Sequence, residues 1–314
     1  MTRPIHPPIY ISGSLAYDRI MDFPGKFSDH ILPEKIHILN VSFAVNGLTE
    51  QFGGTAGNIA YSLSLLGETP TILASAGKDF DRYKAWMEEN KIPTTGIRII
   101  PEEFTAGAYI TTDLSDNQIT GFNPGAMKHP CRYPLKSGDE GQGLGIVSPG
   151  CLEDMLTYSR EFKKNQIPYI CDPGQQIPVL TRDALIEIIT GSEMLVSNDY
   201  ELEMIQKSTG LSRKDLIKKT RAIITTLGEE GSLVWEGDIE TAIPAVAPDA
   251  VLDPTGAGDA YRAGLIKGLL MGKALPDAAR VGATCASYAI AHHGTQEHRF
   301  TIAQFWKRHE ACFG

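Results

Sequence analysis

Short apolar runs alternate along the chain with amphipathic segments, and this alternation predicts the fold class. The runs that predict buried strands are Ile9–Ile11, Thr71–Ala74, Leu144–Val147, Tyr169–Cys171, Met194–Ser197 and Ala222–Thr226. The segments with helical spacing of apolar positions are Ala56–Leu66, Phe80–Glu89, Leu152–Lys163, Arg182–Ile189, Arg213–Lys219, Ala260–Met271, Pro276–Ala291 and Thr301–His309. Strands that alternate with helices favour an α/β fold with a doubly wound, mostly parallel sheet flanked by helices.

Two segments break this alternation. Lys35–Val45 and Thr105–Phe122 are rich in β-forming residues, and Asp116-Asn117 is typical of a hairpin turn. We interpret them as strands of a small accessory β-sheet that could close over a ligand as a lid and exclude water. The alternative is an edge hairpin of the main sheet. Lys136–Gly145, rich in glycine and charge, is expected to be an exposed loop.

Composition and charge narrow the class of protein. The 314 residues are 42% hydrophobic and 21% charged, with a formal net charge of −9, which is typical of a globular protein. No basic run occurs, so we expect no nucleic-acid polymer as a partner, although backbone dipoles could still bind a small anion. No apolar stretch is long enough for a membrane span. The odd number of cysteines, without a C-x-x-C pair, favours reduced thiols and a cytoplasmic location.

The segment Asp253-Pro254-Thr255-Gly256-Ala257-Gly258-Asp259 carries the strongest chemical signal. Its glycines let backbone N–H groups crowd around an anion, and the N-terminus of the following helix adds partial positive charge. Asp259 would stand in the first helical turn, where it could act as a base in phosphoryl transfer. The same carboxylate could instead serve only as a favourable helix cap.

A second pair of glycines, Gly53-Gly54, opens the predicted helix that contains Asn58. This pair permits close approach of a ligand to the backbone, and Asn58 offers both a donor and an acceptor to a hydroxylated ligand. Alternatively, the segment is only a strand-to-helix turn with Thr55 as the N-cap. Asp18 follows the first predicted strand, at the edge where α/β sheets bind ligands. It is either a ligand for a sugar diol or a solvated loop residue.

Two further motifs also follow predicted strands. Asn198 and Glu201 stand at capping-box spacing, and the same pair could order water around Mg²⁺ or phosphate. Thr226, Gly228 and Gly231 could contact the phosphates or ribose of a nucleotide, or form only a tight turn. The sequence lacks G-x-x-x-x-G-K-[ST] and has no G-x-G-x-x-G after a strand, which argues against a P-loop kinase and a dinucleotide dehydrogenase.

Together and in this order, the motifs resemble those of the ribokinase-like (PfkB) carbohydrate kinase family, closest to its bacterial adenosine kinase-like members. The resemblance extends from Gly13 to about Glu297. It implies one ribokinase-like domain over residues 1–314, with a lid formed by about 14–50 and 102–124. It also implies ATP-dependent phosphorylation of a primary hydroxyl. Pro254 stands where many relatives carry Thr, but the glycines and Asp259 are in place.

The resemblance assigns a role to each motif. Asp259 would be the catalytic base, and the N–H groups of the anion hole would come from Gly256, Ala257 and Gly258. The residues that would hold substrate hydroxyls are Asp18, Gly53, Gly54 and Asn58. The residues that would act on ATP are Asn198, Glu201, Thr226, Gly228 and Gly231, with Asn198 and Glu201 reaching Mg²⁺ through water. Asp253 and Thr255 match part of a site for a monovalent cation such as K⁺.

The acceptor is predicted from weaker signals. Phe122–Met127 and Asp172–Gln176 look most like adenosine kinase-like members. We therefore expect conversion of adenosine, or another nucleoside, to the 5′-monophosphate in purine salvage; the alternative is a sugar kinase of the ribokinase or fructokinase type. The aromatic residues that could stack on a base are Phe43, Phe52, Phe104, Tyr109 and Phe122. A binding protein without turnover would have no need of Asp259. Both a monomer and a lid-mediated homodimer remain open.

Overall fold

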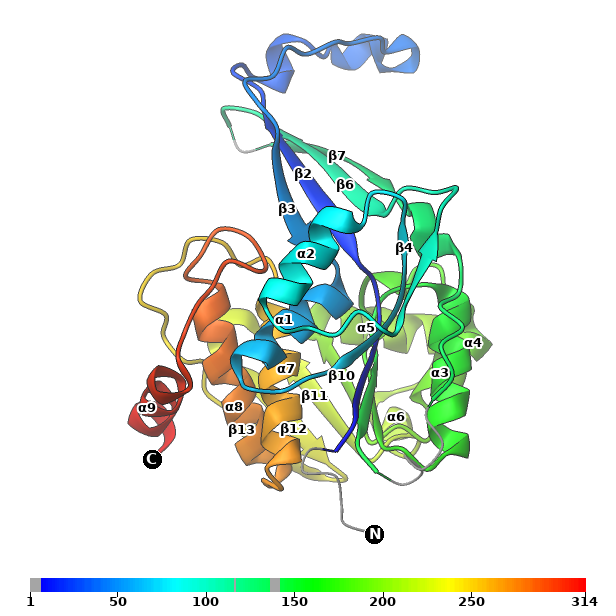
Figure 1. Ribbon diagram of the computed structural model, residues 1–314, viewed down its shortest axis with the longest axis vertical. Helices are drawn as coiled ribbons and strands as arrows, with labels where there is room; N and C mark the ends of the chain where they lie inside the picture. Colours follow the sequence, from blue (N-terminus) through cyan, green and yellow to red (C-terminus); the bar gives the residue numbers. More distant parts are fainter. Residues whose placement is uncertain (1–6, 116, 136–141) are drawn as a thin grey trace.

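The computed structural model describes residues 7–115, 117–135 and 142–314, and within them the chain forms a large sheet and a smaller one (Figure 1). The nine strands of the large sheet found in these residues are, in spatial order, β13 (Ile239–Ile243), β12 (Ser232–Glu236), β11 (Ala222–Thr226), β10 (Met194–Asn198), β9 (Tyr169–Cys171), β8 (Leu144–Val147), β1 (Ile9–Ser12), β4 (Thr71–Gly77) and β5 (Ile97–Ile100). Neighbours from β11 to β5 pair in parallel, whereas β12 and β13 add an antiparallel edge. The predicted mostly parallel α/β sheet is confirmed.

The central strands are apolar throughout because helices cover both of their faces. In β1, Ile9 and Ile11 join the core beneath one layer of helices, and Tyr10 between them joins the core beneath the other. This alternation follows from the twofold period of a strand. It explains why the strands read in the sequence as continuous apolar runs.

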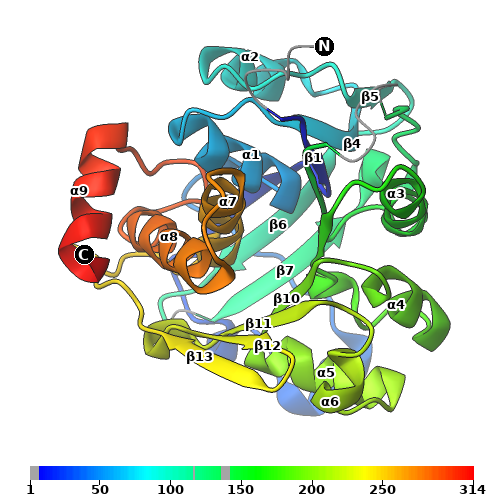
Figure 2. The same cartoon turned by 90° about the horizontal axis from the view of Figure 1, so that it is seen from below.

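Helices α1 (Thr55–Leu65), α7 (Ala257–Leu270) and α8 (Leu275–Ala289) cover one face, with α2 (Asp81–Glu89) beside α1 and α9 (Ile302–Phe313) outside α8 (Figure 2). The helices of the opposite face are α3 (Leu152–Lys164), α4 (Arg182–Ile189), α5 (Asp199–Thr209) and α6 (Arg213–Leu216). The periodicity predicted all of these except α5, which it indicated only through a cap at Asn198. Helix α6 ends earlier than predicted.

The smaller sheet stands above the large one and contains strands from two distant parts of the chain (Figure 1). In the described residues its order is β3 (Thr49–Gly53), β2 (Ala16–Asp22), β6 (Ala106–Thr112) and β7 (Gln118–Asn123). The predicted hairpin within Thr105–Phe122 is confirmed as the β6–β7 pair. Of its predicted turn, Asp116 lies outside the described residues, as does most of the expected loop at Lys136–Gly145.

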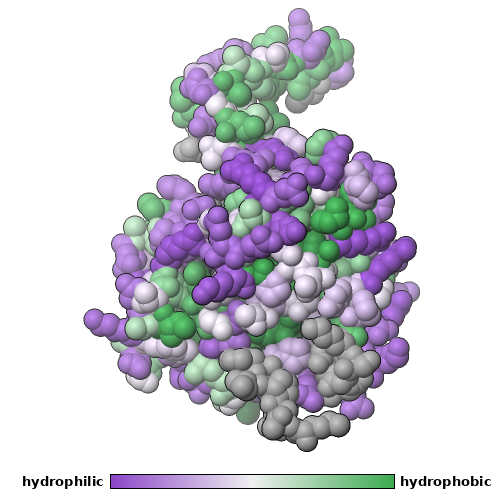
Figure 3. Space-filling view, viewed as in Figure 1, coloured by the Kyte–Doolittle hydropathy of each residue, from purple (hydrophilic) through white to green (hydrophobic). Residues whose placement is uncertain are grey.

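The prediction of a strand within Lys35–Val45 is wrong. A short 3-10 helix, Pro33–Ile38, begins this segment, and the described residues after it contain no strand before β3. Strand β2 already pairs with β3 on one side and β6 on the other, so the segment between β2 and β3 cannot add a strand beside β2. The segment projects beyond both sheets and exposes apolar side chains, including Ile38 and Leu39 (Figures 1 and 3).

Candidate active site

The carboxyl ends of the parallel strands meet at one edge of the large sheet, which faces the smaller sheet. Ser12, Ser148 and Asp172 stand at or directly after the ends of β1, β8 and β9. Asn198 ends β10 and pairs with Thr226, which ends β11. This edge is the usual place for ligands in an open α/β sheet, and the fold gathers most of the predicted site residues around it.

The turn before α7 brings Asp259 to this edge. Gly256 is the N-cap and has a φ of 80°, a left-handed conformation that disfavours residues with a Cβ. The first helical bond runs from the Ala260 N–H to the Gly256 carbonyl at 2.9 Å, so the preceding N–H groups lie outside the helical ladder. The N–H of Ala257 donates to the Pro254 carbonyl at 3.2 Å. The Gly258 N–H is therefore better placed than that of Ala257 to receive an anion.

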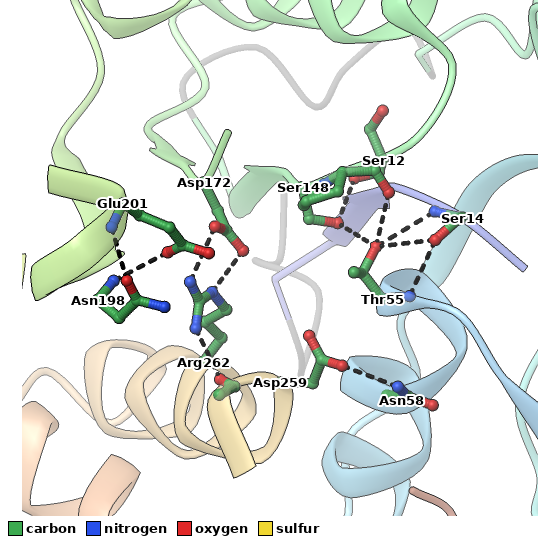
Figure 4. A network of polar contacts seen from close by, with 12 residues as sticks. Ser12, Ser14, Thr55, Asn58, Ser148, Asp172, Asn198, Glu201, Asp259 and Arg262 are labelled. Atoms are coloured by element: carbon green, nitrogen blue, oxygen red, sulfur yellow. Dashed lines mark hydrogen bonds and ion pairs between the residues drawn. The ribbon is translucent and has the colours of Figure 1, made fainter. Parts of the chain in front are cut away.

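Asp259 faces Asn58 of α1 across the interface between the two helices (Figure 4). The Asn58 Nδ2 donates to Asp259 Oδ2 at 2.8 Å, although 201 positions separate the two residues. Burial raises the pKa of Asp259 to about 6, against the opposing effects of the Asn58 hydrogen bond and the Arg262 charge. A carboxylate with such a pKa is ionised at neutral pH and can still accept a proton.

Arg262, one turn further along α7, makes an ion pair with Asp172 that sequence analysis missed. The Arg262 Nη2 donates to Asp172 Oδ1 at 2.8 Å, and its Nη1 donates to the Gly258 carbonyl at 3.0 Å. Both side chains are buried. Burial raises the pKa of Asp172, and the guanidinium opposes that effect. Arg262 thereby connects the glycine turn before α7 to the end of β9. No local sequence motif predicts this long-range contact.

The smaller sheet contributes Asp18, which lies in β2 rather than in a loop. Its half-buried carboxylate lies next to Gly53, where a Cβ would come within 2.5 Å of Asp18 Oδ2. Burial and the charge of Asp253 raise the pKa of Asp18. Gly54, not Thr55, is the N-cap of α1, with a φ of 89°. The predicted substrate residues Asp18, Gly53, Gly54 and Asn58 are therefore neighbours along β2, β3 and α1.

A second network that the sequence did not predict anchors α1 to the large sheet. Thr55 Oγ1 donates to the Pro149 carbonyl at 2.8 Å, and the Thr55 N–H donates to Ser14 Oγ at 3.0 Å. Ser148 Oγ lies 3.1 Å from Thr55 Oγ1 and donates to the Ser12 carbonyl at 2.8 Å (Figure 4). These buried contacts fix the N-terminus of α1, and with it Asn58, relative to β1 and β8.

Strand register divides the five aromatic candidates for base stacking. Ala108 pairs with Asp18 on one side and with Phe122 on the other, so Phe122 shares a face of the smaller sheet with Asp18. Tyr109 points to the opposite face, where its hydroxyl accepts a hydrogen bond from Arg19. The remaining three pack elsewhere: Phe52 against Tyr83 and Trp86, Phe43 against Phe23 and Phe27, and Phe104 beneath Lys78.

Asn198 and Glu201 form the predicted capping box of α5. Asn198 Oδ1 accepts from the Glu201 N–H at 2.7 Å, and Glu201 Oε2 accepts from the Asn198 N–H at 2.9 Å. Burial raises the pKa of Glu201, and its carboxylate faces the Asp172–Arg262 pair (Figure 4). The capping role is therefore present, and the Glu201 carboxylate also lies at the carboxyl edge with the other acidic groups.

The third glycine motif forms the turn between β11 and β12. Gly228 and Gly231 have φ values of 59° and 93°, and the Leu227 N–H donates to the Gly231 carbonyl at 2.8 Å. The turn begins at the end of β11, beside Asn198. It therefore lies at the same edge of the sheet as Asp172 and Glu201.

Asp253 holds the start of the Asp259 motif in place. Its Oδ1 accepts from the Thr255 N–H at 2.9 Å and its Oδ2 accepts from the Gly294 N–H at 3.0 Å. Partial burial raises the pKa of Asp253, but these hydrogen bonds outweigh that effect and lower it. Thus Asp253 joins the turn to the segment after α8.

A scan against protein-family models matches residues 25–301 to the pfkB family of carbohydrate kinases. The chain belongs to the PfkB family. It is therefore a phosphotransferase by family, as the motif resemblance predicted. Within the described residues of this PfkB-family kinase, no helix is long and apolar enough to cross a membrane.

Relatives of this PfkB-family kinase cover nearly all of it. It is 31% identical over 265 residues to a nucleoside kinase of Methanocaldococcus jannaschii, across 84% of this chain and 87% of the relative. Its structure is similar to that of a Burkholderia thailandensis nucleoside kinase in complex with inosine, with 36% identity, a TM-score of 0.85 and 98% coverage of both chains. The same Burkholderia enzyme in complex with ADP-inosine gives 37% identity and a TM-score of 0.83, over 98% of this chain and 96% of the other.

Proposed function

We propose that this PfkB-family kinase transfers the γ-phosphoryl group of ATP to the 5′-hydroxyl of a ribonucleoside, with adenosine as the expected substrate. The hydrogen bond between Asn58 and Asp259 carries this proposal, because it joins the expected substrate residues to the expected base at 2.8 Å. The similarity to nucleoside kinases, one of them in complex with inosine, supports a purine nucleoside as the acceptor.

In the proposed reaction, Asp259 takes the proton of the 5′-hydroxyl as that oxygen forms a bond to the γ-phosphorus. The bond between the γ-phosphorus and the β,γ-bridging oxygen breaks, and ADP leaves with the electron pair. Backbone N–H groups at the start of α7, that of Gly258 above all, would stabilise the charge on the transferring group. The carboxylate is ionised above its pKa of about 6, so the base is available at neutral pH.

The smaller sheet would act as the lid and would contact both the ribose and the base of the nucleoside. The carboxylate of Asp18 can accept hydrogen bonds from the two ribose hydroxyls. Phe122, on the same face as Asp18 and separated from it by Ala108, offers its ring to the base. Only the methyl group of Ala108 lies between them in the register, so the nucleoside would lie across this strand.

The residues at the carboxyl edge fit hydrated Mg²⁺. Among the described residues, no three His, Cys, Asp or Glu side chains are grouped closely enough to hold a metal ion themselves. Mg²⁺ commonly binds through several waters, one or two carboxylates and substrate phosphates. Asn198 and Glu201 could hold such waters, and Mg²⁺ would supply neutralising charge to the phosphates. Thr226, Gly228 and Gly231 would line the ATP site, while K⁺ near Asp253 and Thr255 stays a prediction.

A panel of acceptors tests the proposal. We expect ATP- and Mg²⁺-dependent turnover of adenosine, with inosine, cytidine, ribose and fructose compared under identical conditions and ³¹P NMR locating the phosphate. 5′-Deoxyadenosine, which lacks the acceptor oxygen, is the control and should remain unphosphorylated. Turnover of ribose or fructose without any nucleoside would identify a sugar kinase instead. Binding of nucleosides without turnover of any acceptor would contradict the proposal.

The cellular setting follows from the same proposal. Phosphorylation of a purine nucleoside would return it to the nucleotide pool as purine salvage. All five cysteines are unpaired, which suits the expected cytoplasmic location. A measurement of mass in solution distinguishes a monomer from a lid-mediated homodimer.

A further inference from the structure

The orientation of the Asn58 side-chain amide is determined by residues outside the expected substrate and ATP sites. The indole Nε1–H of Trp86, in α2, can only donate a hydrogen bond. It donates to Gln296 Oε1 at 3.0 Å, which turns the Gln296 Nε2 toward α1. This Nε2 then donates to Asn58 Oδ1, also at 3.0 Å. With its oxygen occupied, Asn58 presents its Nδ2 to Asp259.

The other hydrogen of Gln296 Nε2 is also engaged, so its amide has one orientation that satisfies every partner. Gln296 Nε2 donates to the Tyr83 hydroxyl at 2.6 Å, and that hydroxyl donates to the Gly53 carbonyl at 2.9 Å. Burial raises the pKa of Tyr83, which keeps its hydroxyl protonated and able to donate. Reversing the Gln296 amide would place its oxygen against Asn58 Oδ1 and its nitrogen against the indole N–H.

The residues packed around Gln296 bury its hydrogen bond to Asn58. Gln296 is 2% exposed and Asn58 is 5% exposed, so neither amide can readily exchange its partners for water. A Cβ at Gly57 would overlap the Tyr83 hydroxyl and would lie 3.0 Å from Gln296 Nε2. Gly57 thus makes room on α1 for both residues, which gives the third glycine of the Gly53–Asn58 segment a physical reason.

We propose that Gln296, oriented by Trp86, is a positioning residue that makes Asn58 donate to Asp259 and so keeps the base ionised and aimed at the acceptor hydroxyl. This inference deepens the proposed function and rests on it. If Gln296 did not hold Asn58 Oδ1, rotation of the Asn58 amide would turn an oxygen toward Asp259. The carboxylate would then lose a donor and face a lone pair.

Other groups also act on Asp259 and remain in place when Gln296 is changed. Arg262 of the same helix favours the ionised form, whereas Asp172 after β9 and Glu201 of α5 disfavour it. Tyr83 of α2 lies within range of the charges of both Asp18 and Asp259. We use the term amide chain for the hydrogen bonds that run from Trp86 through Gln296 and Asn58 to Asp259. Because Trp86 carries no charge, a change in the pKa of Asp259 on substitution of Trp86 would show that the amide chain acts on this carboxylate.

Three variants separate this role from simple packing. Gln296→Glu keeps the size but removes the donor, so that Asn58 should rotate to donate to the new carboxylate. Gln296→Met removes the polar groups without adding charge. Trp86→Phe removes the indole N–H together with part of the ring system, and it keeps an aromatic ring to stack on Phe52 and Tyr61. Ser62→Ala is the matched control, since it breaks a buried contact between α1 and His298 that does not reach Asp259.

The readouts are kcat against pH and the titration of Asp259 followed by ¹³C NMR of labelled carboxyl groups, assigned with Asp259→Asn. We expect Gln296→Glu and Gln296→Met to lower kcat by about tenfold or more and to raise the pKa of Asp259 by roughly one unit. Trp86→Phe should also lower kcat and raise the pKa of Asp259, but by smaller amounts. Ser62→Ala should leave kcat and this pKa unchanged. Because Gln296→Glu introduces a charge of its own, agreement between the Glu and Met variants is required.

The titration needs no turnover, so it stands even if the acceptor panel fails. Folded Trp86→Phe and Gln296→Met proteins in which the pKa of Asp259 and kcat match wild type would overturn the inference. If either Gln296 variant does not fold, Trp86→Phe alone decides, since it leaves Gln296 and Asn58 themselves unchanged. A shift in the pKa of Asp259 in these variants, without activity of the wild-type protein on any nucleoside, would support the amide chain and contradict the proposed function.

Discussion

Asn58 and Asp259 share a 2.8 Å hydrogen bond between two helices, α1 and α7, that approach the carboxyl edge of the sheet from different parts of the chain. This single contact joins the motif expected to bind the acceptor to the motif expected to carry the base. It also places a donor on the carboxylate whose ionisation the reaction needs.

The pH dependence of the reaction should report Asp259. The base works only when ionised, so kcat/KM for the nucleoside should fall as the pH is lowered through an apparent pKa of about 6. Saturating MgATP keeps the ionisation of the nucleotide from dominating the profile. A profile that stays flat down to pH 5 would show that the group taking the proton is not this carboxylate.

Neutralising Asp259 should stabilise the fold at neutral pH. Its pKa is raised from 3.8 to about 6, so the folded protein bears a cost for ionising it that the unfolded chain does not. That cost is complete above pH 6 and shrinks as the pH falls toward 3.8. The free-energy cost of ionising Asp259 in the folded protein is at most about 3 kcal/mol. Water that reaches this half-buried residue makes the cost smaller.

Asp259→Asn should therefore raise Tm at pH 8 by a few degrees and by less at pH 5. Calorimetric scans of the variant and the wild-type protein at the two pH values give the comparison. An equal change in Tm at both pH values would mean that the carboxylate carries no burial cost.

Phe122 should contribute to nucleoside binding, whereas Tyr109 should not. Loss of a stacking ring in Phe122→Ala is expected to raise KM for adenosine by roughly tenfold, with a smaller effect on kcat. Tyr109→Ala, on the opposite face of the same sheet, is the matched control and should leave KM near that of wild type. Equal effects of the two substitutions would mean that strand register does not select the contact with the base.

The buried Arg262–Asp172 pair should show strong coupling. Arg262→Met leaves the Asp172 carboxylate buried without its partner and should cost about 3–5 kcal/mol of unfolding free energy. Adding Asp172→Leu should restore much of that stability in urea unfolding experiments. The double variant should still have a low kcat, because the Gly258 carbonyl no longer accepts the hydrogen bond from Arg262. Additive effects of the two substitutions on stability would contradict a direct pair.

The sequence was sufficient where a local spacing determines the structure. The capping box at Asn198 and Glu201, the placement of Asp259 in the first turn of a helix and the buried strands all follow from neighbours along the chain. The position of Asp18 in a strand was missed because β2 pairs with β3 and β6, which are remote from it in sequence. Gln296, which contacts Asn58 across 238 positions, carries no motif that could have drawn attention to it.

Asp259→Asn tests the central claim most directly. The variant keeps the size of the side chain and removes the base, so calorimetry should show nucleoside affinity within a few-fold of wild type. Rapid-quench measurement of a single turnover with ATP, Mg²⁺ and adenosine should show phosphoryl transfer slowed by orders of magnitude. Transfer at a rate near that of the wild-type protein would contradict the assignment of Asp259 as the base.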